Sequence, residues 1–411
     1  MDKTIYLHIG FHKTATTTIQ EGLLLNELRL ARLGYYCPQA GNITNSTISH
    51  HNIVFQIRDD PRYDPLAGRV EDLVIEIRQA KEAKVIISSE DLCLMTLEQV
   101  RTLHSHLAPL GELRVIVYVR RQDQWLASFW SELVKTGNAM DFDESLRERS
   151  SFDFYQRFVP FYQRLTPWSA IFGRENIYVR VLERSQLVHA HPFLDFLDAC
   201  DIKSLDGFRL PQNRNTSPSI KSLTIMRYLF ASIDKHAGTS HRLYKKKIGV
   251  FLQKIGSVLQ NYADEHNWNN ERPNVVDRDT HDRIMFRFAE SNRRLARDYL
   301  DRDELFLEPF EERAVTQYDV AQLTGEEALD LMAYTLYHLL QWAQETLSSG
   351  EVVDTFPKRP ALITRACREL RRNGIQAVLR KLFVWSEHKY KAAIRGKQQF
   401  RKRPDGAERD D

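Results

Sequence analysis

The sequence predicts an α/β fold built on a parallel β-sheet. Short apolar runs alternate along the chain with segments of helical spacing, and this alternation is typical of a parallel sheet with helices on its faces. The chain has 411 residues, of which 42% are hydrophobic and 27% charged. A chain of this length and composition can bury a sizeable core, which excludes an intrinsically disordered protein.

Four short apolar runs are expected to form strands of this sheet, at residues 4–10, 85–88, 113–119 and 177–181. The first run is followed by apolar residues at helical spacing, which predicts a helix from about Thr16 to Leu33. A second helix is expected after the third run, with its apolar face between Leu126 and Val134. Another helix is expected to begin at Pro192.

The second half of the chain has a different character. Residues 213–275 are polar, helical in places and rich in Asn, Lys and His, so we interpret them as a helical insertion or lid. Residues 281–300 return to helical spacing and are expected to pack on the sheet, and residues 326–347 are expected to form a structural helix. The sequence therefore predicts one domain over residues 1–350 and a basic helical extension over residues 351–411.

The formal net charge of +3 hides an uneven distribution. Residues 358–403 contain 15 Lys and Arg but two acids, a net charge of +13, whereas residues 1–357 carry −7. The basic tail has amphipathic spacing, which favours contact with an anionic membrane surface or an acidic glycan. A solubilising helix docked on the core is the alternative. Nucleic-acid binding is not expected, because the body is acidic and contains no recognition motif.

The cysteines and the hydropathy indicate a reducing compartment. Cys37, Cys93, Cys200 and Cys367 form no C-x-x-C pair and have no zinc-site spacing, so we interpret them as reduced, mostly buried thiols. The chain has no run of 18 apolar residues and no secretory signal pattern. We therefore expect a cytoplasmic location, with peripheral membrane association if the basic tail binds lipid.

Residues 10–18, Gly-Phe-His-Lys-Thr-Ala-Thr-Thr-Thr, carry the strongest functional signal. A strand leads into a tight loop that opens a helix, and the backbone N–H groups at such a helix start bind anions. Lys13 adds a positive charge, which favours phosphate binding over an ordinary capped junction. Four hydroxyl donors follow or flank it, at Thr14, Thr16, Thr17 and Thr18. His12 stands where a nucleoside-triphosphatase loop has a glycine, so that class is excluded.

This loop resembles the phosphosulfate-binding loop of sulfotransferases that use 3′-phosphoadenosine 5′-phosphosulfate (PAPS), which follows a strand and reads G-x-x-K-[TS]-[GA]-[TS]-[TS]. That family also has an Arg at a strand end and a Ser eight positions later, and Arg120 and Ser128 have this spacing. Arg121 is the alternative if the strand register shifts by one. By this resemblance, the donor-binding residues are Gly10, His12, Lys13, Thr14, Ala15, Thr16, Thr17, Thr18, Arg120 and Ser128.

The similarity covers roughly residues 4–310 and implies a P-loop-like sulfotransferase fold with PAPS as donor and no required metal. The chain resembles the bacterial carbohydrate sulfotransferases. This resemblance implies transfer to a hydroxyl or amine of a surface or capsular glycan or its precursor. The chain lacks the C-terminal Gly-rich PAPS clamp of the small-molecule enzymes. Residues 212–217 are the candidate replacement.

Sulfuryl transfer needs charge stabilisation on the leaving group and a base for the acceptor. Lys13 is the candidate for the bridging oxygen. For the base, Glu90 follows the run 85–88 and resembles the post-strand glutamate of several carbohydrate sulfotransferases, although an acid there can also serve a helix dipole. The pair His50 and His51, in a polar segment, is the second candidate, and His12 in the loop is the third.

Two other functions remain open from the sequence. Three D-x-D triplets could hold a metal and a nucleotide sugar in a glycosyltransferase. They are Asp141-Phe142-Asp143, Asp277-Arg278-Asp279 and Asp301-Arg302-Asp303. A non-catalytic module that binds a nucleotide or a glycan is the second alternative.

Overall fold

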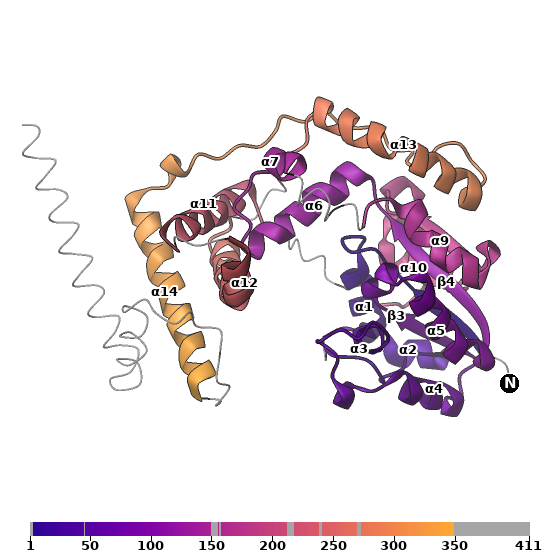
Figure 1. The fold of residues 1–411 in the computed structure, drawn as a ribbon. Helices are drawn as coiled ribbons and strands as arrows, with labels where there is room; N and C mark the ends of the chain where they lie inside the picture. The colour runs from indigo at the N-terminus through magenta and orange to yellow at the C-terminus, as the bar shows by residue number, and fades with distance from the viewer. Residues whose placement is uncertain are drawn as a thin grey trace, which may run out of the picture. The chain divides into compact units, whose positions relative to one another are not determined.

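The computed structural model describes residues 3–44, 46–148, 155, 158–211, 218–237, 241–268 and 273–348 (Figure 1). Contacts between Cα atoms divide the chain into two compact units. The described residues of the first unit fall within Met1–Glu132, Met140–Ser217 and Pro273–Thr316, and those of the second within Leu133–Ala139, Pro218–Arg272 and Gln317–Asp411. The first unit contains the sheet.

A five-stranded parallel sheet forms the centre of the first unit, which confirms the predicted α/β class. The strands are β1 (Lys3–His8), β2 (Tyr35–Tyr36), β3 (Lys84–Ser88), β4 (Gly111–Val119) and β5 (Ile177–Val181). Four of them match the predicted runs to within a few residues. The sequence missed β2, whose two residues are too short to show a periodic pattern.

The strand order is β2-β3-β1-β4-β5, and every pair is parallel. Leu7 of β1 pairs with Ile87 of β3 on one side and with Val115 of β4 on the other. The segments that follow β3, β1 and β4 therefore leave the sheet side by side at its carboxyl edge. In open α/β sheets this edge is where ligands bind.

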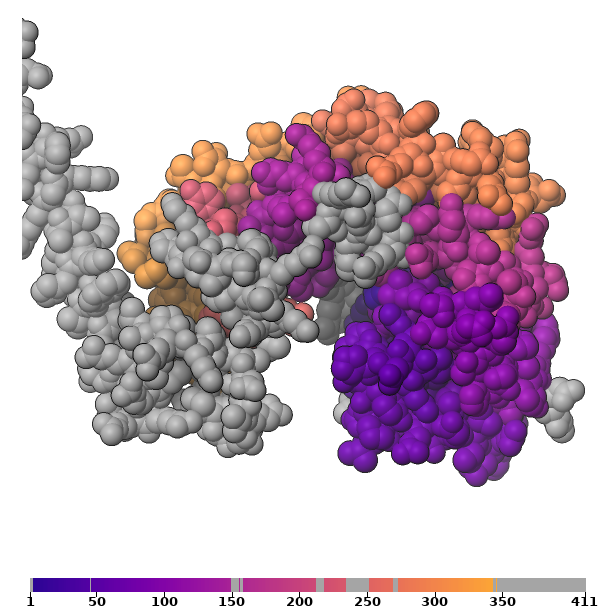
Figure 2. All heavy atoms as spheres, in the orientation of Figure 1, coloured from indigo at the N-terminus to yellow at the C-terminus, as the bar shows by residue number. Residues whose placement is uncertain are grey.

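The first unit has helices on both faces of the sheet. They are α1 (Thr16–Leu25), α2 (Glu27–Arg32), α3 (His51–Ile57), α4 (Val70–Gln79), α5 (Leu97–Leu107), α6 (Gln122–Lys135, which ends in the second unit), α7 (Phe142–Arg147), α9 (Phe161–Phe172), α10 (Pro192–Ala199) and α13 (Arg278–Leu300). In the face shown in Figure 2, the indigo and purple residues of the N-terminal part of the chain pack closely against one another.

The sheet is buried on both faces, as expected for parallel strands. Tyr6, Ile86 and Ile116 point to the face where α1 and α10 contribute Ile19, Leu23, Phe193, Phe196 and Leu197 to one apolar core. The alternate residues Leu7 and Val115 are fully buried as well. The helix α13 contacts β5 and α9. This confirms that residues 281–300 form a helix that packs on the sheet.

The predicted helix over residues 16–33 is wrong in one respect, because it breaks at Asn26 into α1 and α2. The Asn26 side chain is buried, and its amide donates to the carbonyls of Gly22 and Arg209 at 2.8 Å each. Its Oδ1 accepts from the Arg209 N–H. The Asn26 side chain therefore forms hydrogen bonds with the backbone of a residue 183 positions away. Local helical spacing gives no sign of such a contact.

The second unit contains α11 (Ile220–Ala237), α12 (His241–Glu265) and α14 (Gly325–Ser348), with α12 in contact with both of the others. The part of the predicted insertion from Pro218 to Arg272 and the predicted helix 326–347 therefore belong to the same unit. Tyr262 of α12 donates to Asp330 of α14 at 2.8 Å, and Lys221 of α11 pairs with Glu327 of α14 at 2.9 Å.

Several predictions concern parts of the chain outside the described residues. The candidate clamp at 212–217 and the basic tail at 358–403 are among them, as is Cys367. Cys37, Cys93 and Cys200 are buried free thiols, as predicted. Within the described part of the chain, no helix has the length and apolar character needed to cross a membrane.

Candidate functional site

The loop between β1 and α1 has an unusual backbone. Lys13 and Ala15 both have φ near 64°, in the left-handed region that residues other than glycine rarely adopt. Between them, the buried hydroxyl of Thr14 donates to the Phe11 carbonyl at 2.5 Å, and the Thr14 N–H points to the same oxygen. Alternating backbone conformations of this kind turn successive N–H groups toward one side, as in anion-binding nests.

Gly10 is required by close packing inside this loop. A Cβ at this position would lie 2.4 Å from the Thr16 methyl carbon Cγ2 and 3.0 Å from Nε2 of His8. Both neighbours are buried. The glycine therefore lets the strand end approach the first turn of α1 closely enough to form the tight loop.

The remaining loop residues are divided between the interior and the surface. Thr16 is buried, Thr17 is exposed and Thr18 is half-buried. No side chain caps the start of α1, so its first N–H groups are available for an anion. The half-buried Lys13 ammonium lies 3.3 Å from Oε2 of Glu132. Together these donors fit a phosphate group.

Arg120 lies beside the loop, whereas Arg121 is buried in the interior. Arg120 follows the last residue of β4, and its guanidinium donates to the Lys13 carbonyl at 3.3 Å. Arg121 is buried, pairs with Asp123 at 2.9 Å and donates to the carbonyl of Glu308. The strand β4 ends at Val119, so Arg120, as predicted, is the first residue after the strand. Ser128 is half-buried in the second turn of α6.

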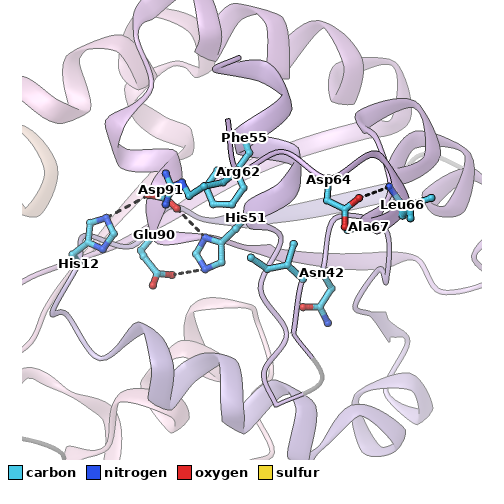
Figure 3. Close-up of a pocket in the computed structure, with 11 residues that line it drawn as sticks. His12, Asn42, His51, Phe55, Arg62, Asp64, Leu66, Ala67, Glu90 and Asp91 are labelled. Atoms are coloured by element: carbon cyan, nitrogen blue, oxygen red, sulfur yellow. Dashed lines mark hydrogen bonds and ion pairs between the residues drawn. The ribbon is translucent and has the colours of Figure 1, made fainter. Parts of the chain in front are cut away.

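A cavity of about 790 Å³ lies beside the loop (Figure 3). Its walls come from the loop after β1, the segment 42–43, α3, the segment 62–67 and the short 3₁₀ helix that follows β3 (Glu90–Leu94). The lining residues are His12, Asn42, Ile43, His51, Phe55, Arg62, Asp64, Leu66, Ala67, Glu90 and Asp91. It therefore brings together three of the predicted site residues, His12, His51 and Glu90.

His51 is the centre of this cavity's polar network. Its Nδ1 lies 2.8 Å from the Ser89 hydroxyl and 3.2 Å from Oδ2 of Asp91, and its Nε2 lies 3.5 Å from Oε2 of Glu90. The ring stacks on Phe55. Burial opposes its protonation, but the contact with Asp91 and the charges of both acids outweigh burial and raise the pKa of His51.

Asp91 connects the cavity with the phosphate loop. Its Oδ1 lies 3.6 Å from Nε2 of His12 and its Oδ2 faces His51. Burial alone would raise the pKa of Asp91, but the contacts with these two histidines outweigh it and hold that pKa well below the usual range. Asp91 is therefore an ionised carboxylate and a poor proton acceptor.

Glu90 is held by the first helix as well as by His51. Gln20 of α1 donates to Oε2 of Glu90 at 2.9 Å, and the same oxygen faces His51. Both of these contacts use Oε2, and Glu90 lines the cavity. The predicted position of Glu90, after a strand at the carboxyl edge, matches the structure.

His50, the other member of the predicted histidine pair, does not line the cavity. It is buried, with Nε2 2.9 Å from the Pro38 carbonyl and Nδ1 accepting from the Ser88 N–H. Burial lowers its pKa. Of the pair, only His51 is placed to meet a bound molecule, and it begins α3 rather than lying in an irregular segment.

Sequence reasoning missed Asp91, Gln20 and Arg62. Asp91 follows Glu90 directly, so its place after the strand was a usable signal. Gln20 and Arg62 carried none, because neither belongs to a motif and only the fold brings them to Glu90 and to the cavity. Arg62 pairs with Asp60 through two hydrogen bonds and lies over the Phe55 ring.

The first Asp of each D-x-D triplet stands at a helix end, and the second forms an ion pair with an arginine. Asp141 and Asp277 are N-caps whose side chains accept from backbone N–H groups, and Asp301 is the C-cap of α13. Within the described residues, no cluster of three or more His, Cys, Asp or Glu side chains is arranged to hold a metal ion.

Comparison with known proteins adds one relative. No family model and no solved structure matches this chain. The chain is similar to an uncharacterized protein of Archaeoglobus fulgidus, with 25% identity over 228 residues. The match covers 54% of this chain and 55% of that protein, so the chain spans about half the length of this relative. The function must therefore be argued from the residues of the site.

Proposed function

We propose that this protein is a sulfotransferase that moves a sulfuryl group from PAPS to a hydroxyl, or an amine, of a carbohydrate acceptor. One observation carries the proposal. The loop between β1 and α1, with its left-handed residues and uncapped helix start, lies beside a cavity with acidic and histidine side chains at the carboxyl edge of the sheet, and His12 belongs to both. A donor phosphate and an acceptor group held in these two places would be neighbours.

The loop has the features that a phosphosulfate needs. Its left-handed residues, its uncapped helix start and the Lys13 ammonium all supply positive potential. Arg120, beside the Lys13 carbonyl, offers a planar fork for a second phosphate. In this proposal Ser128 contributes to that second phosphate, as the resemblance implies.

The reaction is a single displacement at sulfur. The acceptor oxygen forms a bond to sulfur while the bond between sulfur and the bridging phosphate oxygen breaks. The acceptor proton passes to Glu90, and the leaving 3′,5′-bisphosphate keeps the electron pair on an oxygen that Lys13 stabilises. Positioning and charge stabilisation supply most of the rate in such transfers.

The cavity suits a sugar ring. Carboxylates and the Asn42 amide can pair with hydroxyl groups, and the exposed side chains of Ile43 and Leu66 offer apolar surface to the ring face. A surface or capsular glycan or its precursor remains the proposed acceptor class. A cytoplasmic location with a basic tail that contacts membrane or acidic glycan completes the proposal.

The first test is the substitution Lys13→Ala. We expect the affinity for 3′-phosphoadenosine 5′-phosphate to fall by about tenfold or more, because the variant loses one charge-assisted contact to phosphate. Calorimetry measures the affinity, and labelled PAPS with a panel of glycans measures transfer. Lys81→Ala is the matched control, because this exposed lysine lies at the amino edge of the sheet, just before β3.

The same assay separates the competing functions. Unchanged nucleotide affinity in the Lys13 variant contradicts the loop assignment. Transfer that persists in EDTA supports a sulfotransferase, whereas activity that requires a metal and a nucleotide sugar supports a glycosyltransferase. Nucleotide binding without transfer to any acceptor identifies a binding module.

A further inference from the structure

The two ring nitrogens of His51 face two different carboxylates. Oδ2 of Asp91 lies 3.2 Å from Nδ1, and Oε2 of Glu90 lies 3.5 Å from Nε2 (Figure 3). A neutral imidazole carries one N–H and one lone pair. Either neutral tautomer of His51 would therefore turn a lone pair toward a negative charge in a half-enclosed cavity, whereas the imidazolium donates to both sides.

We propose that Asp91 is a positioning residue that keeps His51 as an imidazolium, so that the charged ring orients Glu90 and Glu90, rather than His51, receives the acceptor proton. The catalytic half of this inference rests on the proposed sulfuryl transfer. The protonation of His51 does not, and it can be measured without any acceptor.

Burial and contacts distinguish Asp91 from the other acids of the cavity. It is 7% exposed and divides its two oxygens between His12 and His51. Asp64, by contrast, is exposed and uses Oδ1 to accept from the Leu66 N–H. Asp91 therefore acts on the histidines as a fixed counter-ion, and Asp64 offers a control within the same cavity.

Other side chains near His51 also affect its protonation. The Ser89 hydroxyl, 2.8 Å from Nδ1, can accept from the imidazolium or donate to a neutral ring. Phe55 of α3 stacks on the ring and is uncharged. The positive charge of Arg62 opposes protonation, but Arg62 is paired with Asp60. The two adjacent carboxylates prevail, in agreement with the raised pKa of His51.

The decisive experiment is a pH titration of His51 by nitrogen–proton correlation NMR in the full chain, with His51→Gln used to assign the signal. We expect both ring nitrogens of the unmodified protein to be protonated near neutral pH. In Asp91→Asn the titration midpoint should fall by at least about one pH unit, because one opposite charge is lost. Asp64→Asn should leave the midpoint of His51 where it was.

Two results would overturn the inference. One is a neutral His51 at neutral pH, with the Ser89 hydroxyl donating to its Nδ1. The other is a midpoint that does not move in Asp91→Asn. If Asp91→Asn fails to fold, Asp91→Ser removes the same carboxylate, and an unchanged midpoint in that variant is equally contradictory.

Turnover then tests the catalytic half. The pKa of His51 is raised, so the imidazolium is present below the ordinary value of about 6.5 and is lost as the pH rises through the raised value. The rate should therefore fall on the alkaline side, and Asp91→Asn should move this fall to lower pH and reduce kcat about tenfold with unchanged nucleotide affinity. A shifted NMR midpoint with an unshifted rate profile rejects the positioning role alone. A protein that transfers no sulfuryl group rejects the proposed function but leaves the NMR result intact.

Discussion

The acidic and histidine side chains at the cavity differ in the contacts they make, and these contacts indicate a different role for each. Asp91 is held as a carboxylate by two histidines, and His51 is held by two carboxylates. Glu90 lines the cavity and uses the same oxygen, Oε2, for Gln20 and His51. Of the three predicted base candidates, Glu90 is therefore the one whose contacts suit proton transfer.

Substitution of Glu90 by Gln tests this assignment. The amide is isosteric and can still accept from Gln20 through its oxygen, so the fold should be preserved while the base is lost. We expect kcat to fall by about 10²-fold or more, with nucleotide affinity close to that of the unmodified protein. Steady-state transfer kinetics and calorimetry make the two measurements.

The exposed Glu98 of α5 is the matched control for Glu90, because its carboxylate pairs with Arg101 and does not line the cavity. Near-normal turnover in the Glu90 variant would transfer the role of base to His12, or to His51 if the NMR titration finds that ring neutral.

The loop, considered as one element, depends on close packing as much as on charge. Its left-handed residues are followed by a helix whose first turn contacts the strand end through Gly10 and Thr16. Because Gly10 itself has no positive φ, the backbone tolerates a side chain there and only the space forbids it.

Gly10→Ala should therefore weaken nucleotide binding and destabilise the fold by about 1–3 kcal/mol, a typical cost of overpacking. Adding Thr16→Ser removes the methyl carbon that the new Cβ would meet at 2.4 Å and keeps the hydroxyl. The double variant should recover part of both losses, as measured by thermal unfolding and calorimetry. If Gly10→Ala alone binds the nucleotide normally, this packing argument is incorrect.

On the scale of the whole molecule, the charge distribution separates two roles. The nucleotide would be bound by a few placed residues in a body with a net charge of −7, whereas the +13 segment at 358–403 lies outside the described residues. Bulk positive charge is therefore not the means of binding the donor. We propose that the tail determines where the protein resides or which acceptor it gathers.

A vesicle-flotation experiment tests the membrane version of this role. The full chain should float with vesicles that contain phosphatidylglycerol and remain below with vesicles of phosphatidylcholine alone, because each basic residue near an anionic surface contributes about 1 kcal/mol. A truncation to residues 1–357 should remain below in both cases. Equal behaviour of the two proteins would leave glycan recruitment as the role to test, with an immobilised acidic polysaccharide as the probe.

Much of the fold could be predicted from the sequence because the information is local. Four strands could be predicted because each is a short apolar run. The loop could be predicted from residues 10–18, because the strand, the lysine and the threonines follow one another. The site could be predicted only in part. Glu90 and Arg120 could be found because each lies within two residues of a strand end, whereas Asp91 was overlooked and Gln20 belongs to no motif.

The sequence by itself determined the α/β class, the tight loop between the first strand and the first helix, and the arginine that borders it, since strand spacing and motif order are properties of neighbouring residues. Only the tertiary structure decided that His12, His51 and Asp91 meet in one network, and that Asn26 breaks the first helix to serve Arg209. These contacts join segments tens to hundreds of residues apart. The order of the strands brings them together, and no local pattern encodes that order.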